Sequence, residues 1–180
     1  VLEFAEQYWI DVAGMSDEIV NKLLEHFDSS AMFSLVHAIY AIDGAQHNAG
    51  LNGVAIEARK GDAFDVLEEL AAQGRRFDVA IVDPPAFIKR RKDQAKGEAA
   101  YRRLNQLAIG LLDDEALLVS CSCSFHLDAA ALPGLLQAAA VHQGRRLQVI
   151  AMGGQSADHP VHPAMPETRY LKALFCRISR

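Results

Sequence analysis

One cysteine in this sequence has the chemistry and the setting of a covalent catalyst. Cys123 lies in a serine–cysteine run, residues 120–124, that follows an apolar segment. A thiolate is the side chain best suited to add to carbon 6 of a cytosine, and this addition makes carbon 5 nucleophilic enough to attack a sulfonium methyl group. Core packing, a redox pair and metal binding are the competing interpretations. Metal is disfavoured because the Cys-x-Cys pair has no second cysteine pair.

An acidic residue followed by two prolines forms the second candidate feature. Asp83-Pro84-Pro85-Ala86-Phe87 comes directly after a short apolar segment. Two prolines make a stiff loop with few hydrogen-bond donors, which would fix the aspartate in place. A pocket that grips a flipped-out base needs such a rigid polar edge. We therefore favour a role in a site over a plain structural turn.

Three further acids are candidates for contacting a nucleoside. Asp43 could accept hydrogen bonds from the two ribose hydroxyls, and a turn aspartate before Gly44 is nearly as good an interpretation. Asp62 could accept a hydrogen bond from an adenine amino group, with Phe64 as an apolar wall. It could equally cap a helix, and one carboxylate can do both. Glu3 follows a possible strand at residues 1–4.

A run of basic residues comes directly after the proline loop. Such runs are usually solvated surface. On a chain with a formal net charge of −5, next to a base pocket, this one is better explained as an edge that contacts phosphates. Its members are Lys89, Arg90, Arg91 and Lys92.

The elements that must position these residues alternate between strand and helix. We expect strands at residues 1–4, 33–42, 54–59, 77–82, 116–124, 146–151 and 170–178, with a turn at Asp43-Gly44. Helices are expected after Ser16 and Asp62, around Leu104 to Leu112, and around Leu127 to Leu136. Strands buried on both faces that alternate with helices indicate an α/β, Rossmann-like, doubly wound and mostly parallel sheet. Ligands of such sheets bind beyond the carboxyl ends of the strands, where the candidates lie.

Composition limits the class of protein. With 180 residues, of which 51% are hydrophobic and 23% charged, the chain suits one globular domain, residues 1–180. It contains no apolar run of membrane-spanning length and no export signal, and its three cysteines suit a reducing compartment. We therefore expect a cytoplasmic protein with no membrane partner.

From about residue 49 onward the sequence resembles the RlmI-type 23S ribosomal RNA cytosine-5 methyltransferases, which have the class I methyltransferase fold. The resemblance rests on several motifs together: NAGLNG at 48–53, GDAF at 61–64, DPPAF at 83–87 and SCSCS at 120–124. It is reinforced by GQ at 154–155, DHP at 158–160 and PETRYLK at 166–172.

The resemblance implies S-adenosylmethionine as cofactor and large-subunit ribosomal RNA as partner, without a metal. It implies that Cys123 is the nucleophile, that Asp83 holds the target cytosine, that Asp62 contacts the cofactor adenine and that Asp43 is the ribose acid. The other residues expected at the cofactor are Glu3, Ala63, Phe64, Asp83 and Pro84, and those expected at the RNA are Pro85, Phe87, Lys89, Arg90, Arg91 and Lys92. Family members usually carry a PUA-type RNA-binding domain upstream, which we do not find here, and a homodimer is one assembly to test.

The first fifty residues depart from the family pattern. The family has a glycine-rich turn after its first strand, whereas here no glycine follows Glu3 until Gly14. Side chains at such a turn would crowd the cofactor. Two alternatives to cytosine-5 methylation therefore stay open: methylation of an exocyclic base amine, and an RNA-binding domain with a degenerate cofactor site.

Overall fold

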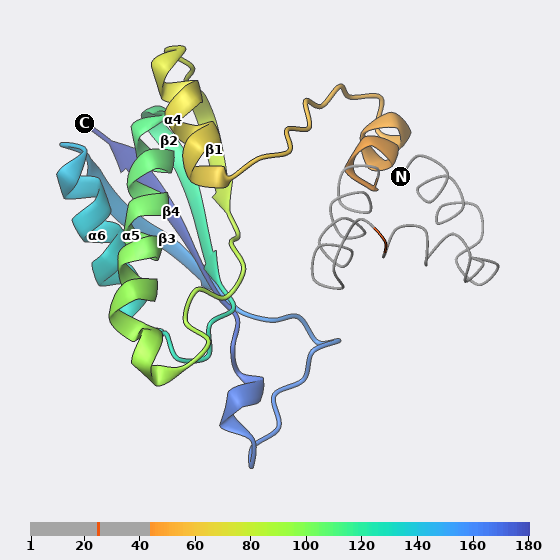
Figure 1. The fold of residues 1–180 in the computed structure, drawn as a ribbon, viewed down its shortest axis with the longest axis vertical. Helices are drawn as coiled ribbons and strands as arrows, with labels where there is room; N and C mark the ends of the chain where they lie inside the picture. The colour runs from red at the N-terminus through yellow and green to blue at the C-terminus, as the bar shows by residue number, and fades with distance from the viewer. Residues whose placement is uncertain (1–24, 26–43) are drawn as a thin grey trace. The chain divides into compact units, whose positions relative to one another are not determined.

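The computed structural model describes residue 25 and residues 44–180 (Figure 1). The chain divides into two compact units, Val1–Lys60 and Gly61–Arg180. Glu3, Asp43, the helix expected after Ser16 and the strands expected at 1–4 and 33–42 lie outside the described residues.

In the first unit, residues 44–51 form a helix. The prediction of a turn at Asp43-Gly44 is therefore wrong for Gly44, which begins this helix, and Asp43 lies outside the described residues. The helix ends in a Schellman motif, in which Gly53 has a φ of 64° and the N–H of Val54 donates to the carbonyl of Ala49 at 3.0 Å. The strand expected at 54–59 is also wrong, because these exposed residues pair with no strand in the described part of the chain. A β-branched, alternating segment forms a strand only where a neighbour accepts its backbone hydrogen bonds.

The second unit alternates between helices and strands. Its elements are α4 (Ala63–Ala72), β1 (Phe77–Val82), α5 (Gln94–Gly110), β2 (Leu112–Ser122), α6 (Ala131–His142), β3 (Arg146–Gly153) and β4 (Lys172–Ser179). Short 3-10 turns lie at Arg91–Asp93 and Pro166–Thr168. The strand at 77–82 is confirmed residue for residue, and the others are confirmed with shifted ends.

The four strands form one mixed sheet in the order β1-β2-β4-β3. β1 and β2 are parallel, with α5 as the crossover between them, whereas β4 runs antiparallel to both β2 and β3. The α/β class is thus confirmed, although only one of these three pairings is parallel. The carboxyl ends of β1 and β2 point the same way, so the loops that follow them meet at one edge of the sheet.

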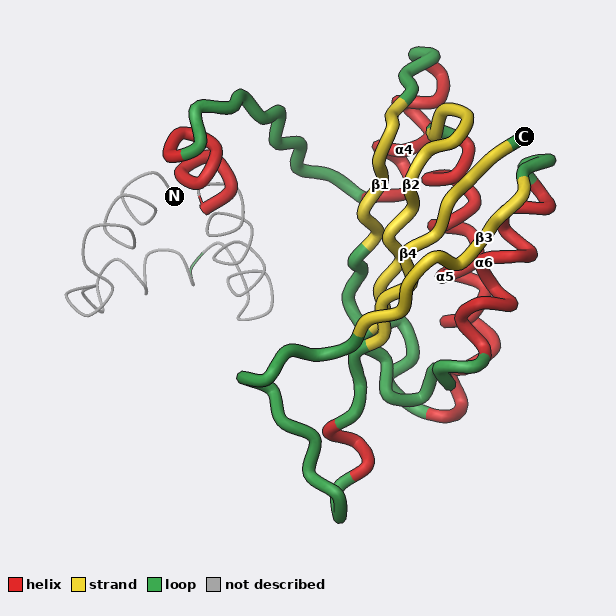
Figure 2. The backbone as a smooth tube through the Cα atoms, turned by 180° about the vertical axis from the view of Figure 1, so that it is seen from behind, coloured by secondary structure: helices red, strands yellow, loops and turns green. Residues whose placement is uncertain are grey.

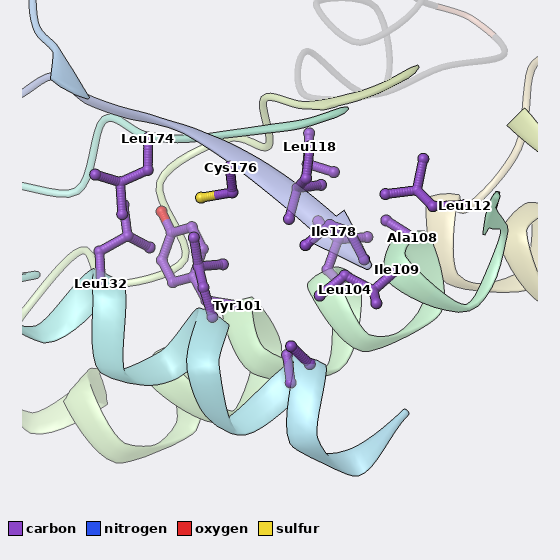
Figure 3. Close-up of a cluster of buried hydrophobic side chains, with 14 of the residues drawn as sticks. Tyr101, Leu104, Ala108, Ile109, Leu112, Leu118, Leu132, Leu174, Cys176 and Ile178 are labelled. Carbon is purple, nitrogen blue, oxygen red and sulfur yellow. The ribbon is translucent and has the colours of Figure 1, made fainter. Parts of the chain in front are cut away.

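Helices α4, α5 and α6 lie on the same side of this sheet (Figures 1 and 2). Apolar side chains of α5 and α6, such as Ile109 and Leu132, form the core with Leu118 of β2 and Cys176 of β4 (Figure 3). Burial raises the pKa of Cys176 to about 11, so this thiol stays protonated at neutral pH and packs as a small apolar residue.

The opposite face of the sheet carries none of the helices of the second unit, residues 61–180 (Figure 2). Ile81 on β1 is 71% exposed. No described helix is long and apolar enough to cross a membrane. The described residues also contain no group of three or more His, Cys, Asp or Glu that could hold a metal ion.

Candidate active site

Parallel pairing of β1 and β2 brings the proline loop and the serine–cysteine run together. Val82 pairs with Ser120, so the two segments leave the sheet side by side. The Sγ atom of Cys123 lies 3.9 Å from the carbonyl oxygen of Pro84. Asp83 is exposed, Pro84 is buried and Cys123 is half-buried. The thiol therefore faces the loop and is not sealed within the apolar core.

The neighbouring cysteine lies in a different electrostatic setting. Burial raises the pKa of Cys121, and the negative charge of Asp83 raises it further. Cys121 therefore stays a neutral thiol at physiological pH, which makes it a poor nucleophile. Asp83 follows Val82, which pairs with Ser120, so it leaves the sheet near the end of β2.

A buried hydrogen-bond network ties the two segments to helix α5. The hydroxyl of Tyr101, which is fully buried, lies 2.8 Å from Ser124 Oγ and accepts a 2.9 Å hydrogen bond from Ser122 Oγ. Ser124 Oγ in turn accepts from the backbone N–H of Ile88 at 3.2 Å. Ser122 and Ser124 flank Cys123, and Ile88 ends the proline loop. The network thus fixes the positions of the thiol and of the loop relative to each other.

Replacing Tyr101 with phenylalanine tests this network. We expect Tyr101→Phe to lower the free energy of unfolding by about 1–3 kcal/mol, because two buried serine hydroxyls lose a partner. Urea denaturation followed by circular dichroism measures the change. Tyr170→Phe is the matched control, since the Tyr170 hydroxyl has no hydrogen-bond partner among residues 44–180, and it should be nearly neutral. Equal unfolding midpoints for the two variants would show that the network contributes nothing.

An aromatic cluster links the start of α4 to the proline loop. The ring of Phe87 lies 4.8 Å from that of Tyr101 and 6.4 Å from that of Phe64, centroid to centroid. Asp62 caps α4, because its Oδ1 accepts the backbone N–H of Phe64 at 2.8 Å. Asp62 and Ala63 are exposed, whereas Phe64 and Phe87 are half-buried. The capping role of Asp62 is therefore present, and its second oxygen has no hydrogen-bond partner among residues 44–180.

A lysine from β4 lies beside the catalytic candidate. The ammonium group of Lys172 donates to the carbonyl of Ser124 at 2.7 Å and to that of Tyr170 at 2.9 Å. Burial lowers the pKa of Lys172, while the charges of Cys123 and Asp128 act in the opposite direction. Lys172 therefore ties the start of β4 to the segment that follows Cys123.

The basic residues after the loop are on the surface. Lys89, Arg90, Arg91 and Lys92 are exposed, as is Pro85. Arg90 pairs with Asp93 at 3.0 Å, whereas the guanidinium of Arg91 makes no ion pair within the described part of the chain. The positions of these residues are compatible with contacts to a polyanion.

Sequence reasoning missed Tyr101, Ser122, Ser124 and Lys172. Part of the signal was present, because alternation along a strand places Ser122 and Ser124 on one face and the two cysteines on the other. Tyr101 also shares the buried stripe of α5 with Leu104 and Ala108, at helical spacing. A tyrosine in such a stripe needs a partner for its hydroxyl, and two serines on a facing strand supply it.

Curated proteins resemble this chain in sequence over about three quarters of its length. No protein-family model matches the chain. The ribosomal RNA large subunit methyltransferase I of Serratia proteamaculans is 37% identical over 141 residues, which cover 77% of this chain and 36% of that protein. The protein of the same name from Yersinia pseudotuberculosis is 38% identical over 140 residues, covering 76% and 35%. The chain spans about a third of the length of these curated relatives.

Solved structures support the same relationship at the level of the fold. A protein described as a methyltransferase and crystallised with SAH has a TM-score of 0.59 at 16% identity, covering 73% of this chain and 35% of that chain. A methyltransferase homologue from Pyrococcus horikoshii has a TM-score of 0.52 at 18% identity, covering 76% and 49%. Identity this low shows the fold alone. The sequence match shows that, over about three quarters of its length, the chain is homologous to proteins named ribosomal RNA large subunit methyltransferase I.

Proposed function

We propose that this chain provides the catalytic part of an S-adenosylmethionine-dependent methyltransferase that modifies carbon 5 of a cytosine in large-subunit ribosomal RNA. The observation that carries the proposal is the placement of the Cys123 thiol 3.9 Å from the Pro84 carbonyl, at the edge of the Asp-Pro-Pro loop. The names of the curated relatives support the substrate class.

The chemistry requires a nucleophile and a group that orients the base. The Cys123 thiolate forms a bond to carbon 6 of cytosine, and the electron pair of the 5,6 double bond moves to carbon 5. Carbon 5 then takes the methyl group as the bond from carbon to the sulfonium sulfur breaks. Loss of the carbon-5 proton to a base expels the thiolate and restores the double bond. Asp83 is exposed at the same edge, where its carboxylate can accept a hydrogen bond from the cytosine amino group.

The described residues fit a nucleoside cofactor near the proline loop. S-adenosylmethionine, when bound, supplies an electrophilic methyl group. Asp62 has one carboxylate oxygen committed to its helix cap and one available for an adenine amino group, while Phe64 offers a half-buried ring. Ala63 and Pro84 complete the expected contacts on this side. Glu3 and Asp43, the acids expected to bind the remainder of the cofactor, lie outside the described residues.

The organisation of the whole chain is part of the proposal. We infer that residues 1–180 act as one methyltransferase domain in the cytoplasm, and a homodimer stays a prediction. The curated relatives are named for large-subunit ribosomal RNA, and the exposed cluster Lys89 to Lys92 offers the positive charge that binding to an RNA backbone needs.

Trapping of a covalent adduct tests the mechanism. The full chain is incubated with S-adenosylmethionine and a large-subunit ribosomal RNA transcript that contains 5-fluorocytidine. We expect a protein–RNA adduct that survives denaturing electrophoresis. Fluorine takes the place of the carbon-5 proton that a base must remove, so the thiolate cannot be expelled.

Mass spectrometry of nucleosides from unmodified transcript then identifies the product. The proposal requires 5-methylcytidine. If the methyl group is found on an exocyclic amine and no adduct forms, the cytosine-5 mechanism is wrong and the chain methylates a base amine instead. Binding of the transcript without any methyl transfer would indicate a degenerate cofactor site.

A further inference from the structure

A hollow of about 700 Å³ opens beyond the carboxyl ends of β2 and β3, next to the candidate active site. Its lining includes Phe125 and Asp128 from the loop after β2, Arg91 before α5, and Arg169 and Lys172 around the start of β4. Cys123 does not line it, but Phe125 lies two residues further along the chain. The hollow is therefore separate from the thiol and adjacent to it.

The charge of this hollow is opposite to that of the chain as a whole. Arg91, Arg169 and Lys172 oppose the single carboxylate of Asp128, whereas the chain carries a formal net charge of −5. The guanidinium groups of Arg91 and Arg169 form no ion pair with any carboxylate among residues 44–180, and both side chains are exposed. Guanidinium groups in this state are suited to phosphate oxygens.

An exposed aromatic ring lies in the same lining. Phe125 is 45% exposed, and its ring contacts His126 edge-on with 5.4 Å between centroids. Aromatic rings presented beside basic groups are the usual platform for the bases of single-stranded nucleic acids, since every base has a face that can stack. A free phosphate would use the cations but would have no need of the ring.

We propose that this hollow binds the nucleotide next to the target base in single-stranded RNA, with the base stacked on Phe125 and the phosphate held by Arg91 and Arg169. The inference rests on the proposed function for its choice of RNA. It adds a second subsite, which holds the strand while the target base lies at Asp83 and Cys123. Lys172 contributes to both places, because it lines the hollow and holds the Ser124 carbonyl.

Equilibrium binding of two fluorescent 12-nucleotide probes tests the subsite in the full chain. One probe is single-stranded RNA, and the other has the same backbone without bases. We expect Phe125→Leu to weaken binding of the RNA about tenfold and to leave the abasic probe unaffected. Arg169→Ala should weaken binding of both probes about tenfold and reduce the slope of log K against log salt by about 0.7.

Arg146→Ala is the matched control. Arg146 is an exposed arginine at the start of β3, and the hollow lies at the other end of this strand, where Gly153 lines it. This variant should change neither affinity nor slope by more than twofold. Wild-type-like binding by both Phe125→Leu and Arg169→Ala, or a wild-type chain that binds neither probe, would overturn the subsite. Binding is measured without methyl transfer, so an inactive chain that still shows these differences would refute the catalytic proposal and leave the subsite standing.

Discussion

Cys123→Ala is expected to abolish methyl transfer, with a fall of at least about a thousandfold in the rate. Without the thiolate, nothing adds to carbon 6, and carbon 5 of cytosine stays too weak a nucleophile to attack the methyl donor. The fold should survive, because Cys123 is half-buried and lies outside the apolar core. Incorporation of labelled methyl groups into large-subunit ribosomal RNA measures the rate, and thermal unfolding verifies the fold.

Cys121→Ala is the control for this variant. Cys121 is also half-buried and lies two residues earlier, near the end of β2, and its pKa is raised by burial and by Asp83. Its removal should leave the rate within a few-fold of wild type. A rate that collapses in Cys121→Ala and persists in Cys123→Ala would assign the nucleophile to the other cysteine. Normal transfer by both variants would exclude covalent catalysis by either cysteine.

The meeting of Cys123 and the proline loop could be predicted because it follows from two recognisable strands and the expectation that they are parallel neighbours. Residues 77–82 form an uninterrupted β-rich segment closed by Asp83-Pro84, and no other element suits them. Once this strand and the one ending near Ser122 are accepted as parallel neighbours, their carboxyl ends must lie at one edge. The pairing of Val82 with Ser120 and the contact of Cys123 with Pro84 agree with that reasoning.

The parts that sequence reasoning missed depend on side-chain packing between elements, which no strand or helix pattern specifies. Tyr101 and Ser124 are 23 positions apart, and only the packing of α5 against the sheet brings their hydroxyls within hydrogen-bond distance. Lys172 reaches the Ser124 carbonyl across 48 positions. The strand expected at 54–59 is wrong although the segment has a strand-like pattern, because no neighbouring strand pairs with it within the described residues.

Gly97→Ala is expected to displace the proline loop from its place beside Cys123. A Cβ atom at this buried position of α5 would lie 2.3 Å from Cγ1 of Ile88 and 3.1 Å from the carbonyl oxygen of Phe87. The helix backbone and the loop cannot both keep their positions, so we expect a loss of about 1–3 kcal/mol in the free energy of unfolding. Because the loop carries Asp83, methyl transfer should fall by roughly a hundredfold.

Two further variants separate this steric effect from any general sensitivity of the helices. Gly134→Ala in α6 meets no atom within 4 Å and should stabilise the protein by about 0.5–1 kcal/mol through helix propensity. Ile88→Ala removes the atom that the new methyl group would strike, so in the double variant with Gly97→Ala the losses in stability should be smaller than the sum of the single losses. Additive losses would mean that Gly97 does not set the position of the loop. Coupled losses with recovered methyl transfer would show that the close approach of α5 to residues 87 and 88 holds Asp83 beside the thiol.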